Sequence, residues 1–163
     1  MSETKAGYIA LMGRILLIAA AAWLVFTKVF LVMQVTGDEM FPAMKDGDLI
    51  IAFRLQKDYA KNDIVAYSYG GEKCVGRVAA LEHDVVMLGE DGILSVNGTE
   101  QHEEILYPTY AGDSLVYPYK VSDGEVFVLG DYRTAAHDSR ERGEIPMESI
   151  EGKVISLFRR RGL

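Results

Sequence analysis

Residues 130–143 read Gly-Asp-Tyr-Arg-Thr-Ala-Ala-His-Asp-Ser-Arg-Glu-Arg-Gly, and this stretch decides the interpretation of the whole chain. It follows an apolar run at 125–130 that is typical of a strand. Four shorter motifs precede it, and their order carries as much information as their residues. The set of five is the basis for the fold and the site that we expect.

Short runs of β-branched and aromatic residues upstream of this stretch predict strands, with turn residues between them. Asn97-Gly98 predicts a type I′ hairpin turn, because both central residues of that turn need a positive φ. With Thr99 these residues also match a glycosylation sequon, but we favour the turn. Residues 100–120 look like an irregular excursion. We therefore expect a mainly antiparallel β domain over 34–163, with strands at 49–53, 63–67, 73–78, 84–88, 93–96 and 125–130.

The N-terminal segment predicts a membrane anchor within residues 1–33. Residues 8–33 are apolar except for Arg14 and Lys28, and the uninterrupted part, 15–27, is short of the ~20 residues that a span needs. Long basic side chains can reach the interface from a helix end, so the span must extend beyond one of them. The alternative is a cleaved signal peptide. The absence of a small-x-small cleavage site after the apolar run favours an uncleaved anchor.

Charge asymmetry predicts the direction of this anchor. Lys5 and Arg14 precede the span and the acidic bulk of the chain follows it. The positive-inside rule then places the N-terminus in the cytoplasm and the β domain outside. We expect a single-pass protein of the cell membrane.

Composition excludes several classes of protein. A net charge of −7 argues against a nucleic-acid binder, because phosphate contacts need a basic surface. The arginines at 159–161 are interpreted as a solvated tail rather than a patch for anionic headgroups. Cys74 is the only cysteine, so no intramolecular disulfide forms. His83, His102 and His137 are scattered, which argues against a metal site; no cofactor or small-molecule ligand is expected.

The ordered motifs resemble those of type I signal peptidases (S26), the membrane serine proteases that cut leader peptides from exported proteins. The resemblance covers nearly the whole chain and implies a signal-peptidase-like β domain behind a transmembrane helix. The motifs are Val35-Thr-Gly-Asp-Glu-Met-Phe-Pro, Asp46-Gly-Asp-Leu-Ile-Ile-Ala-Phe-Arg, Asn62-Asp-Ile-Val-Ala-Tyr with Cys74-Val-Gly-Arg-Val, Ser95-Val-Asn-Gly, and the 130–143 stretch.

The chain departs from this family where the chemistry is done. In the family a serine attacks the scissile carbonyl and a neutral lysine takes its proton, since a hydroxyl is a weak nucleophile without an adjacent base. Here Glu39 holds the nucleophile position and Gly76 the base position. Ala136 holds the position of a serine that hydrogen-bonds the lysine. Losing a nucleophile or base costs ~10⁴- to 10⁶-fold in turnover, so we expect no peptidase activity.

Neighbouring residues do not replace the missing pair. Thr36 and Lys73 lie three residues from the vacated positions, and odd offsets on an extended strand point to opposite faces. Cys74 shares the face of Gly76 but has no base.

A peptide-binding cleft is still expected around the vacated positions, because strand addition at an exposed sheet edge uses main-chain hydrogen bonds. Gly76 would widen this cleft. Glu39 either faces Arg77 or a basic ligand group, or it turns to solvent or pairs with a nearby arginine. The residues assigned to the cleft are Glu39, Met40, Pro42, Val75, Gly76 and Arg77.

The resemblance also implies roles for the rest of the 130–143 stretch and for partners. Asp131, Arg133, Asp138, Ser139 and Arg140 are expected to brace the site. The substitutions are similar to those of signal-peptidase-like proteins of Gram-positive bacteria that lack the dyad and are needed for sortase-dependent pilus polymerisation. That similarity implies an accessory or chaperone role beside pilin subunits and a pilin-specific sortase. The alternatives are a peptidase with a rearranged site and a decoy that holds preproteins.

Overall fold

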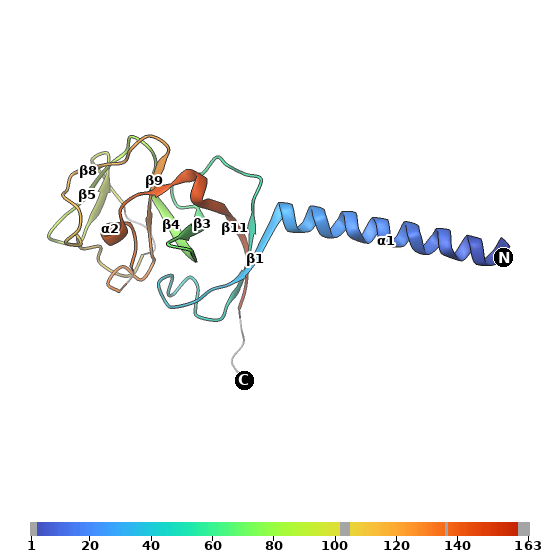
Figure 1. Cartoon of the computed structure of the whole chain (residues 1–163). Helices are drawn as coiled ribbons and strands as arrows, with labels where there is room; N and C mark the ends of the chain where they lie inside the picture. Colours follow the sequence, from blue (N-terminus) through green and yellow to red (C-terminus); the bar gives the residue numbers. More distant parts are fainter. Residues whose placement is uncertain (1–2, 102–104, 136, 160–163) are drawn as a thin grey trace.

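A long helix projects from a β domain in the computed structural model (Figure 1), which describes residues 3–101, 105–135 and 137–159, with side chains from residue 7 onward. The helix is α1 (Glu3–Val29), and its stretch Gly7–Val29 is long and apolar enough to cross a membrane. Twenty-three residues at about 1.5 Å each exceed a hydrocarbon layer of about 30 Å. This stretch extends past Arg14 toward the N-terminus and is compatible with a membrane anchor.

The helix ends earlier than the expected anchor boundary after residue 33. Residues Phe30–Gln34 form strand β1, which pairs antiparallel with β2 (Leu49–Phe53). Residues 30–33 therefore belong to the sheet rather than to the anchor. The apolar run hid this change from helix to strand, because it continues without a turn residue across residue 29.

The main sheet has seven strands in the order β1-β2-β11-β3-β4-β9-β10, and all neighbouring pairs are antiparallel. This confirms the expected fold class. The short helix α2 (Ser139–Arg142) and the 3₁₀ turn η1 (Met147–Ser149) lie between its last strands. The remaining strands of this sheet are β3 (Ile64–Tyr69), β4 (Glu72–Ala80), β9 (Glu125–Leu129), β10 (Ile145–Pro146) and β11 (Ile150–Phe158).

The nine-residue strand β11 lies near the middle of the sheet and was not among the strand candidates. Its register shifts between Ile150 and Gly152 and again between Val154 and Ser156. Each irregularity interrupts the alternation of inward and outward side chains, so a period of two does not appear in the sequence. Gly152 is needed here, since a Cβ atom would lie 2.6 Å from the carbonyl oxygen of Phe53.

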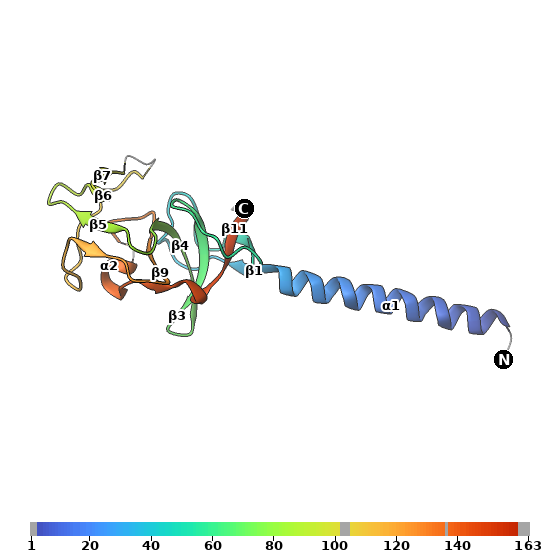
Figure 2. The same cartoon turned by 90° about the horizontal axis from the view of Figure 1, so that it is seen from above.

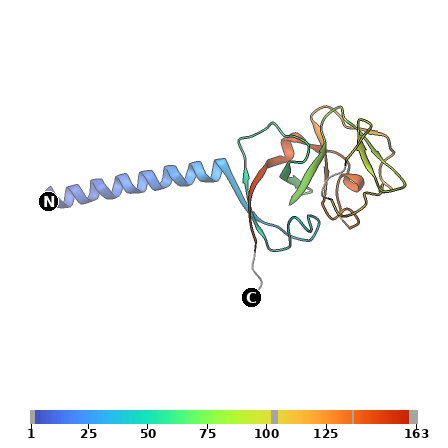
Figure 3. The same ribbon diagram turned by 180° about the vertical axis from the view of Figure 1, so that it is seen from behind.

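The smaller sheet has the order β7-β6-β5-β8 and lies at the end of the domain farthest from α1, as Figures 2 and 3 show. Its strands are β5 (Val85–Leu88), β6 (Leu94–Val96), β7 (Thr99–Glu100) and β8 (Tyr119–Lys120). Asn97 and Gly98 join β6 to β7 with φ values of 54° and 77°, which confirms the predicted turn. Within the expected irregular segment 100–120, the described residues between Glu100 and Tyr119 form no strand, but Glu100 ends β7 and Tyr119–Lys120 form β8.

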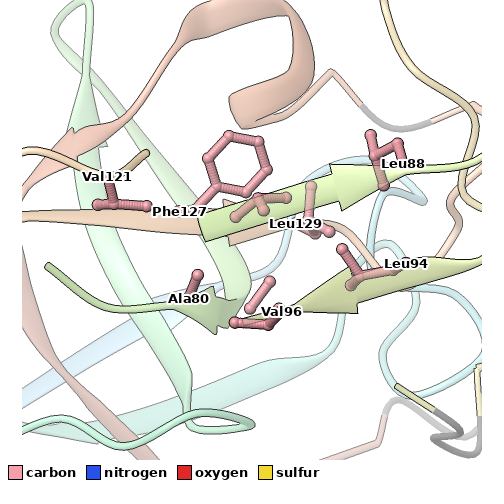
Figure 4. Packing of buried hydrophobic residues seen from close by; sticks show 9 residues of the cluster. Ala80, Leu88, Leu94, Val96, Val121, Phe127 and Leu129 are labelled. Atoms are coloured by element: carbon pink, nitrogen blue, oxygen red, sulfur yellow. The ribbon is translucent and has the colours of Figure 1, made fainter. Parts of the chain in front are cut away.

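A shared apolar core connects the two sheets. Figure 4 shows Phe127 and Leu129 of β9 packed among Leu88, Leu94 and Val96 of the small sheet. This cluster packs β9 of the main sheet, and with it the start of the 130–143 stretch, against the small sheet.

Candidate functional site

The loop that carries Glu39 is held in place by its own backbone and by one buried side chain. Val35 N donates to Asp48 O at 2.8 Å and Gly47 N donates to Val35 O at 2.9 Å, which closes the loop. Met40 is buried in a cluster with Val75 of β4. Glu39, next to Met40, therefore points outward, and its side chain keeps 31% of its exposure.

The loop and the 130–143 stretch meet directly. Tyr132 N donates to Glu39 O at 2.9 Å, and the Phe41 and Tyr132 rings lie edge to face with centroids 6.1 Å apart. The motif at 35–42 and the motif at 130–143 thus form one continuous corner, although residues 43–129 separate them in the sequence.

A pocket of about 120 Å³ opens between this loop and β4. Of the six residues assigned to the cleft, Glu39, Met40 and Val75 line the pocket, whereas Pro42, Gly76 and Arg77 do not. The other lining residues are Met33, Val35, Thr36, Gly37, Glu72, Lys73, Cys74 and Arg142.

Gly76 does not widen the cleft, so that expectation was wrong. A Cβ atom at this residue would lie 2.4 Å from Cγ1 of Val128 and 3.4 Å from Cε1 of Tyr67. Valine is restricted at χ1 and cannot easily rotate away. Burial also raises the pKa of the Tyr67 hydroxyl, so this ring stays neutral. The space that a longer side chain at residue 76 would need is filled by the neighbouring strands.

Arg77 pairs with Asp131. Its Nε donates to Oδ1 of Asp131 at 2.8 Å and its second guanidinium nitrogen reaches Oδ2 at 2.6 Å. This bidentate pair joins β4 to the first residues of the 130–143 stretch.

Arg142 is the residue of this site that the sequence did not indicate. One guanidinium nitrogen lies 3.9 Å from Oε1 of Glu39 and the other donates to Sγ of Cys74 at 3.5 Å. The guanidinium carbon also lies 5.1 Å from the centroid of the Tyr69 ring. Three charged residues follow Ser139 in a row, and only the turn of α2 decides which one enters the pocket. Of the two arrangements left open for Glu39, the structure has the pairing with a nearby arginine.

Asp138 organises the buried part of the 130–143 stretch. It caps α2 by accepting from Arg140 N at 3.1 Å, and it accepts from Gly130 N at 3.0 Å. The Arg140 guanidinium donates to both carboxylate oxygens, at 2.8 and 2.9 Å. Both residues are buried. One carboxylate therefore ties the end of β9 to the start of α2.

The other residues expected to brace the site are also buried and bonded. Ser139 Oγ accepts from Val128 N at 3.0 Å, and Arg133 donates to Oγ1 of Thr109 at 2.9 Å. Val128 is the same residue that closes the space beside Gly76. The vacated position and the bracing stretch are thus linked through β9.

Among the described residues that line the pocket, no hydrogen bond joins the Thr36 hydroxyl or the Cys74 thiol to a carboxylate or an amine. The Lys73 amine lies 3.2 Å from the Glu151 carboxylate. Cys74 has the Arg142 guanidinium beside it, and a guanidinium cannot take a proton in proteins. Thr36 lines the pocket on the loop side.

Four residues named in the sequence analysis lie outside the described residues: His102, Ala136, Arg160 and Arg161. Arg159 is described, and it donates to Ala43 O of the Glu39 loop at 3.2 Å. No group of three or more His, Cys, Asp or Glu residues in the described part of the chain could hold a metal ion.

Comparison with known proteins gives a consistent result. Signal peptidase I of Bacillus caldolyticus is 31% identical over 136 residues, which are 74% of this chain and 74% of that protein. Signal peptidase IB of Staphylococcus aureus (strain Mu50 / ATCC 700699) is 30% identical over 144 residues, 76% of this chain and 75% of that protein.

A plant relative and a solved structure extend this comparison. The probable chloroplastic thylakoidal processing peptidase 2 of Arabidopsis thaliana is 34% identical over 140 residues, 77% of this chain but only 36% of that protein. The chain thus spans little more than a third of this relative's length. The crystal structure of a signal peptidase I from Enterococcus faecalis V583 matches with a TM-score of 0.52 at 24% identity, covering 61% of this chain and 97% of that one. It supports the fold alone.

The family model for signal peptidase, peptidase S26, matches residues 8–158, which include α1, the Glu39 loop and the whole 130–143 stretch. By this match, and by its likeness to the two bacterial enzymes, the chain belongs to the signal peptidase family, peptidase S26.

Proposed function

We propose that this chain is a family member without peptidase activity, which binds an extended peptide between the Glu39 loop and β4. One observation carries the proposal: the base position is both empty of a side chain and closed to one, because Val128 fills the space beside Gly76. A mobile lysine stem has no room there. The nucleophile position holds a carboxylate that faces a permanently charged guanidinium.

The chemistry available to Glu39 supports the same conclusion. Attack of a carboxylate on an amide would form an anhydride, which is a much harder route than ester formation by a serine. The nitrogen group that pairs with Glu39 is the Arg142 guanidinium, which cannot accept the proton that a hydrolytic water must lose. Loss of nucleophile or base typically removes ~10⁴- to 10⁶-fold of turnover.

The first half of β4 supports peptide binding. The described ladder between β4 and β9 begins at Arg77, so residues 72–76 pair with β3 alone. Their other edge faces the pocket that Glu72, Lys73 and Cys74 line. A peptide in extended form can add to such an open edge through main-chain hydrogen bonds.

Arg142 supplies the specific contact. Its side chain is 23% exposed, and its contacts to Glu39 at 3.9 Å and to sulfur at 3.5 Å are weak for a guanidinium. Hydrogen bonds from charged donors contribute about 1.5–3 kcal/mol, so a peptide carbonyl or carboxylate is a better acceptor for it. Arg142 therefore points to an oxygen-bearing ligand.

The peptide that we propose is part of a pilin subunit, with a pilin-specific sortase as the second partner. The support is the resemblance to the signal-peptidase-like proteins that lack the Ser/Lys pair and act in pilus assembly. An anchor formed by α1, with the N-terminus in the cytoplasm and the β domain outside, would place the cleft on the face where pilins and sortase meet.

Titration of the full chain in detergent with a labelled pilin precursor and, separately, with a signal-peptide substrate tests the proposal. Fluorescence anisotropy would report binding, and mass spectrometry of the same samples would report cleavage. We expect binding without cleavage, and about tenfold weaker binding for Arg142→Gln. Lys120→Gln, an exposed change on the distal sheet, is the matched control. If the native chain binds neither ligand, or cleaves one, the proposal is wrong.

A further inference from the structure

A second pocket lies where α1 meets the main sheet, and it shares no lining residue with the peptide cleft. Its volume is about 420 Å³. Three cations from separate segments line it: Lys28 in the last turn of α1, Arg54 just after β2, and Lys57 in the following loop. Thr27, Glu148, Ile150 and Glu151 complete the lining.

The backbone fixes these cations relative to one another. Arg54 N donates to Val29 O at 2.8 Å, so the β1–β2 ladder continues to the last residue of the helix. Lys57 Nζ donates to Ile150 O at 3.2 Å, which holds the loop against β11. These hydrogen bonds join the end of α1, the end of β2 and the following loop, and so bring Lys28 beside Arg54 and Lys57, which are distant from it in the sequence.

Three cations and two carboxylates, Glu148 and Glu151, line this pocket, so its formal charge is +1. Arg54 lies 3.7 Å from Glu151, but that carboxylate has shorter contacts to Ser68 at 2.7 Å and Lys73 at 3.2 Å. Within the described residues, the Lys28 side chain makes no hydrogen bond or ion pair. Such a group of cations is unusual on a chain whose net charge is −7.

The surroundings of the pocket are apolar on the helix side. Lys28 lies at the end of the Gly7–Val29 stretch, at the boundary between apolar and polar surface. Trp23 and Leu24 lie one turn before Thr27 and Lys28 on the same helix faces, and both side chains are exposed. A tryptophan at this depth is typical of the membrane interface.

We infer that this pocket binds the phosphate of an anionic phospholipid, whose acyl chains run along α1 beside Trp23 and Leu24. Clusters of Lys and Arg directly outside a membrane span attract anionic headgroups. A ligand with one anionic oxygen group and long apolar chains fits both halves of the site, whereas a free phosphate would use only the cations. The inference rests on α1 as a membrane anchor and is independent of what the peptide cleft binds. Binding here would fix the orientation of the β domain on the bilayer surface.

Titration of the full chain in neutral detergent with dihexanoyl phosphatidylglycerol, dihexanoyl phosphatidylcholine and glycerol phosphate tests this site, followed by phosphorus NMR or calorimetry. We expect the anionic lipid to bind most tightly. The variant Lys28→Gln/Arg54→Gln/Lys57→Gln should bind it at least tenfold more weakly. Lys28→Arg/Lys57→Arg should retain binding, because the charge remains.

The matched control, Lys45→Gln/Lys61→Gln/Lys120→Gln, removes the same charge from exposed residues elsewhere and should bind like the native chain. Unchanged melting temperatures and unchanged peptide binding would show that the pocket variant is folded. Equal affinity for the zwitterionic lipid, equal affinity for glycerol phosphate, or undiminished binding by the pocket variant would each overturn the inference.

Discussion

The bracing residues around Asp131 and Asp138 and the pair formed by Glu39 and Arg142 are neighbours in the fold but are built differently. Around Asp131 and Asp138, both carboxylates and the Arg140 guanidinium are buried, the Arg77 side chain is 19% exposed, and carboxylate and guanidinium groups meet at 2.6–2.9 Å. At the corner, Glu39 and Arg142 are partly exposed and lie 3.9 Å apart. The two kinds of pair contribute differently to stability. Breaking a buried charge pair costs much of the unfolding free energy, whereas a long, partly exposed pair contributes little. The framework therefore holds whatever residues occupy the corner.

The largest effect should come from breaking the buried pair at Asp138. Asp138→Ala removes the cap of α2 and leaves the Arg140 guanidinium buried without this carboxylate. Removing one partner of a buried pair costs about 3–5 kcal/mol of unfolding free energy. Urea unfolding of the full chain in detergent, followed by circular dichroism, measures this. The exposed Asp113→Ala is the control, and a loss as small as the control's would refute the contrast.

A smaller loss is expected when a side chain is added at the closed base position. Gly76→Ala places a Cβ atom against Val128 and should cost about 1–3 kcal/mol of unfolding free energy through overpacking. Val128→Ala makes room, so the double variant should be more stable than the sum of the two single losses predicts. A double-mutant cycle by urea unfolding checks this. Strict additivity would show that Val128 does not close the position.

The main sheet should also weaken in acid through Glu151. Burial alone would raise the pKa of this carboxyl, but hydrogen bonds from Ser68 and Lys73 lower it below its ordinary value of 4.5. The contribution of Glu151 is then fully present above pH 4.5 and is lost as the pH falls through the lowered pKa. Its hydrogen bonds should contribute about 1 kcal/mol. The unfolding free energies of the native chain and of Glu151→Gln, each measured at pH 7 and at pH 3, give this contribution. If the native chain exceeds the variant by the same amount at both pH values, the assignment is wrong.

The smallest effect is expected at the corner itself. Glu39→Gln removes a partly exposed charge whose pairing with Arg142 is long, so the unfolding free energy should change by less than about 0.5 kcal/mol. Measured beside Asp138→Ala under the same conditions, this variant sets the lower end of the comparison. A loss comparable to that of Asp138→Ala would remove the distinction between the two regions.

The sequence predicted the sheet better than it predicted the corner. Strand 49–53 matches β2 residue for residue, since five apolar residues stand between the turn signal Gly47-Asp48 and the charged Arg54. Strand β11 was not predicted, because two register irregularities interrupt the alternation of its inward and outward side chains. The end of α1 at Val29 was not predicted, because the apolar run continues from the helix into β1.

The positions of the site residues could be predicted from the sequence, but their contacts could not. Motif order located Glu39 and Gly76, but only the three-dimensional packing reveals that Val128 closes the space beside Gly76. Arg142 could not be chosen from a row of charged residues without knowing where α2 turns. Local patterns thus identify elements and motifs, whereas contacts between distant segments decide which side chains meet.

The most direct test of the central claim is a cleavage assay that needs no ligand identification. The full chain in detergent would be incubated with a standard signal-peptide substrate beside an active signal peptidase, and products would be scored by mass spectrometry. We predict no product above the uncatalysed background for the native chain, for Glu39→Ser, and for Glu39→Ser/Gly76→Lys, because Val128 still blocks the lysine stem. Cleavage by the native chain that disappears when a single pocket residue is changed would show that the chain is an active peptidase.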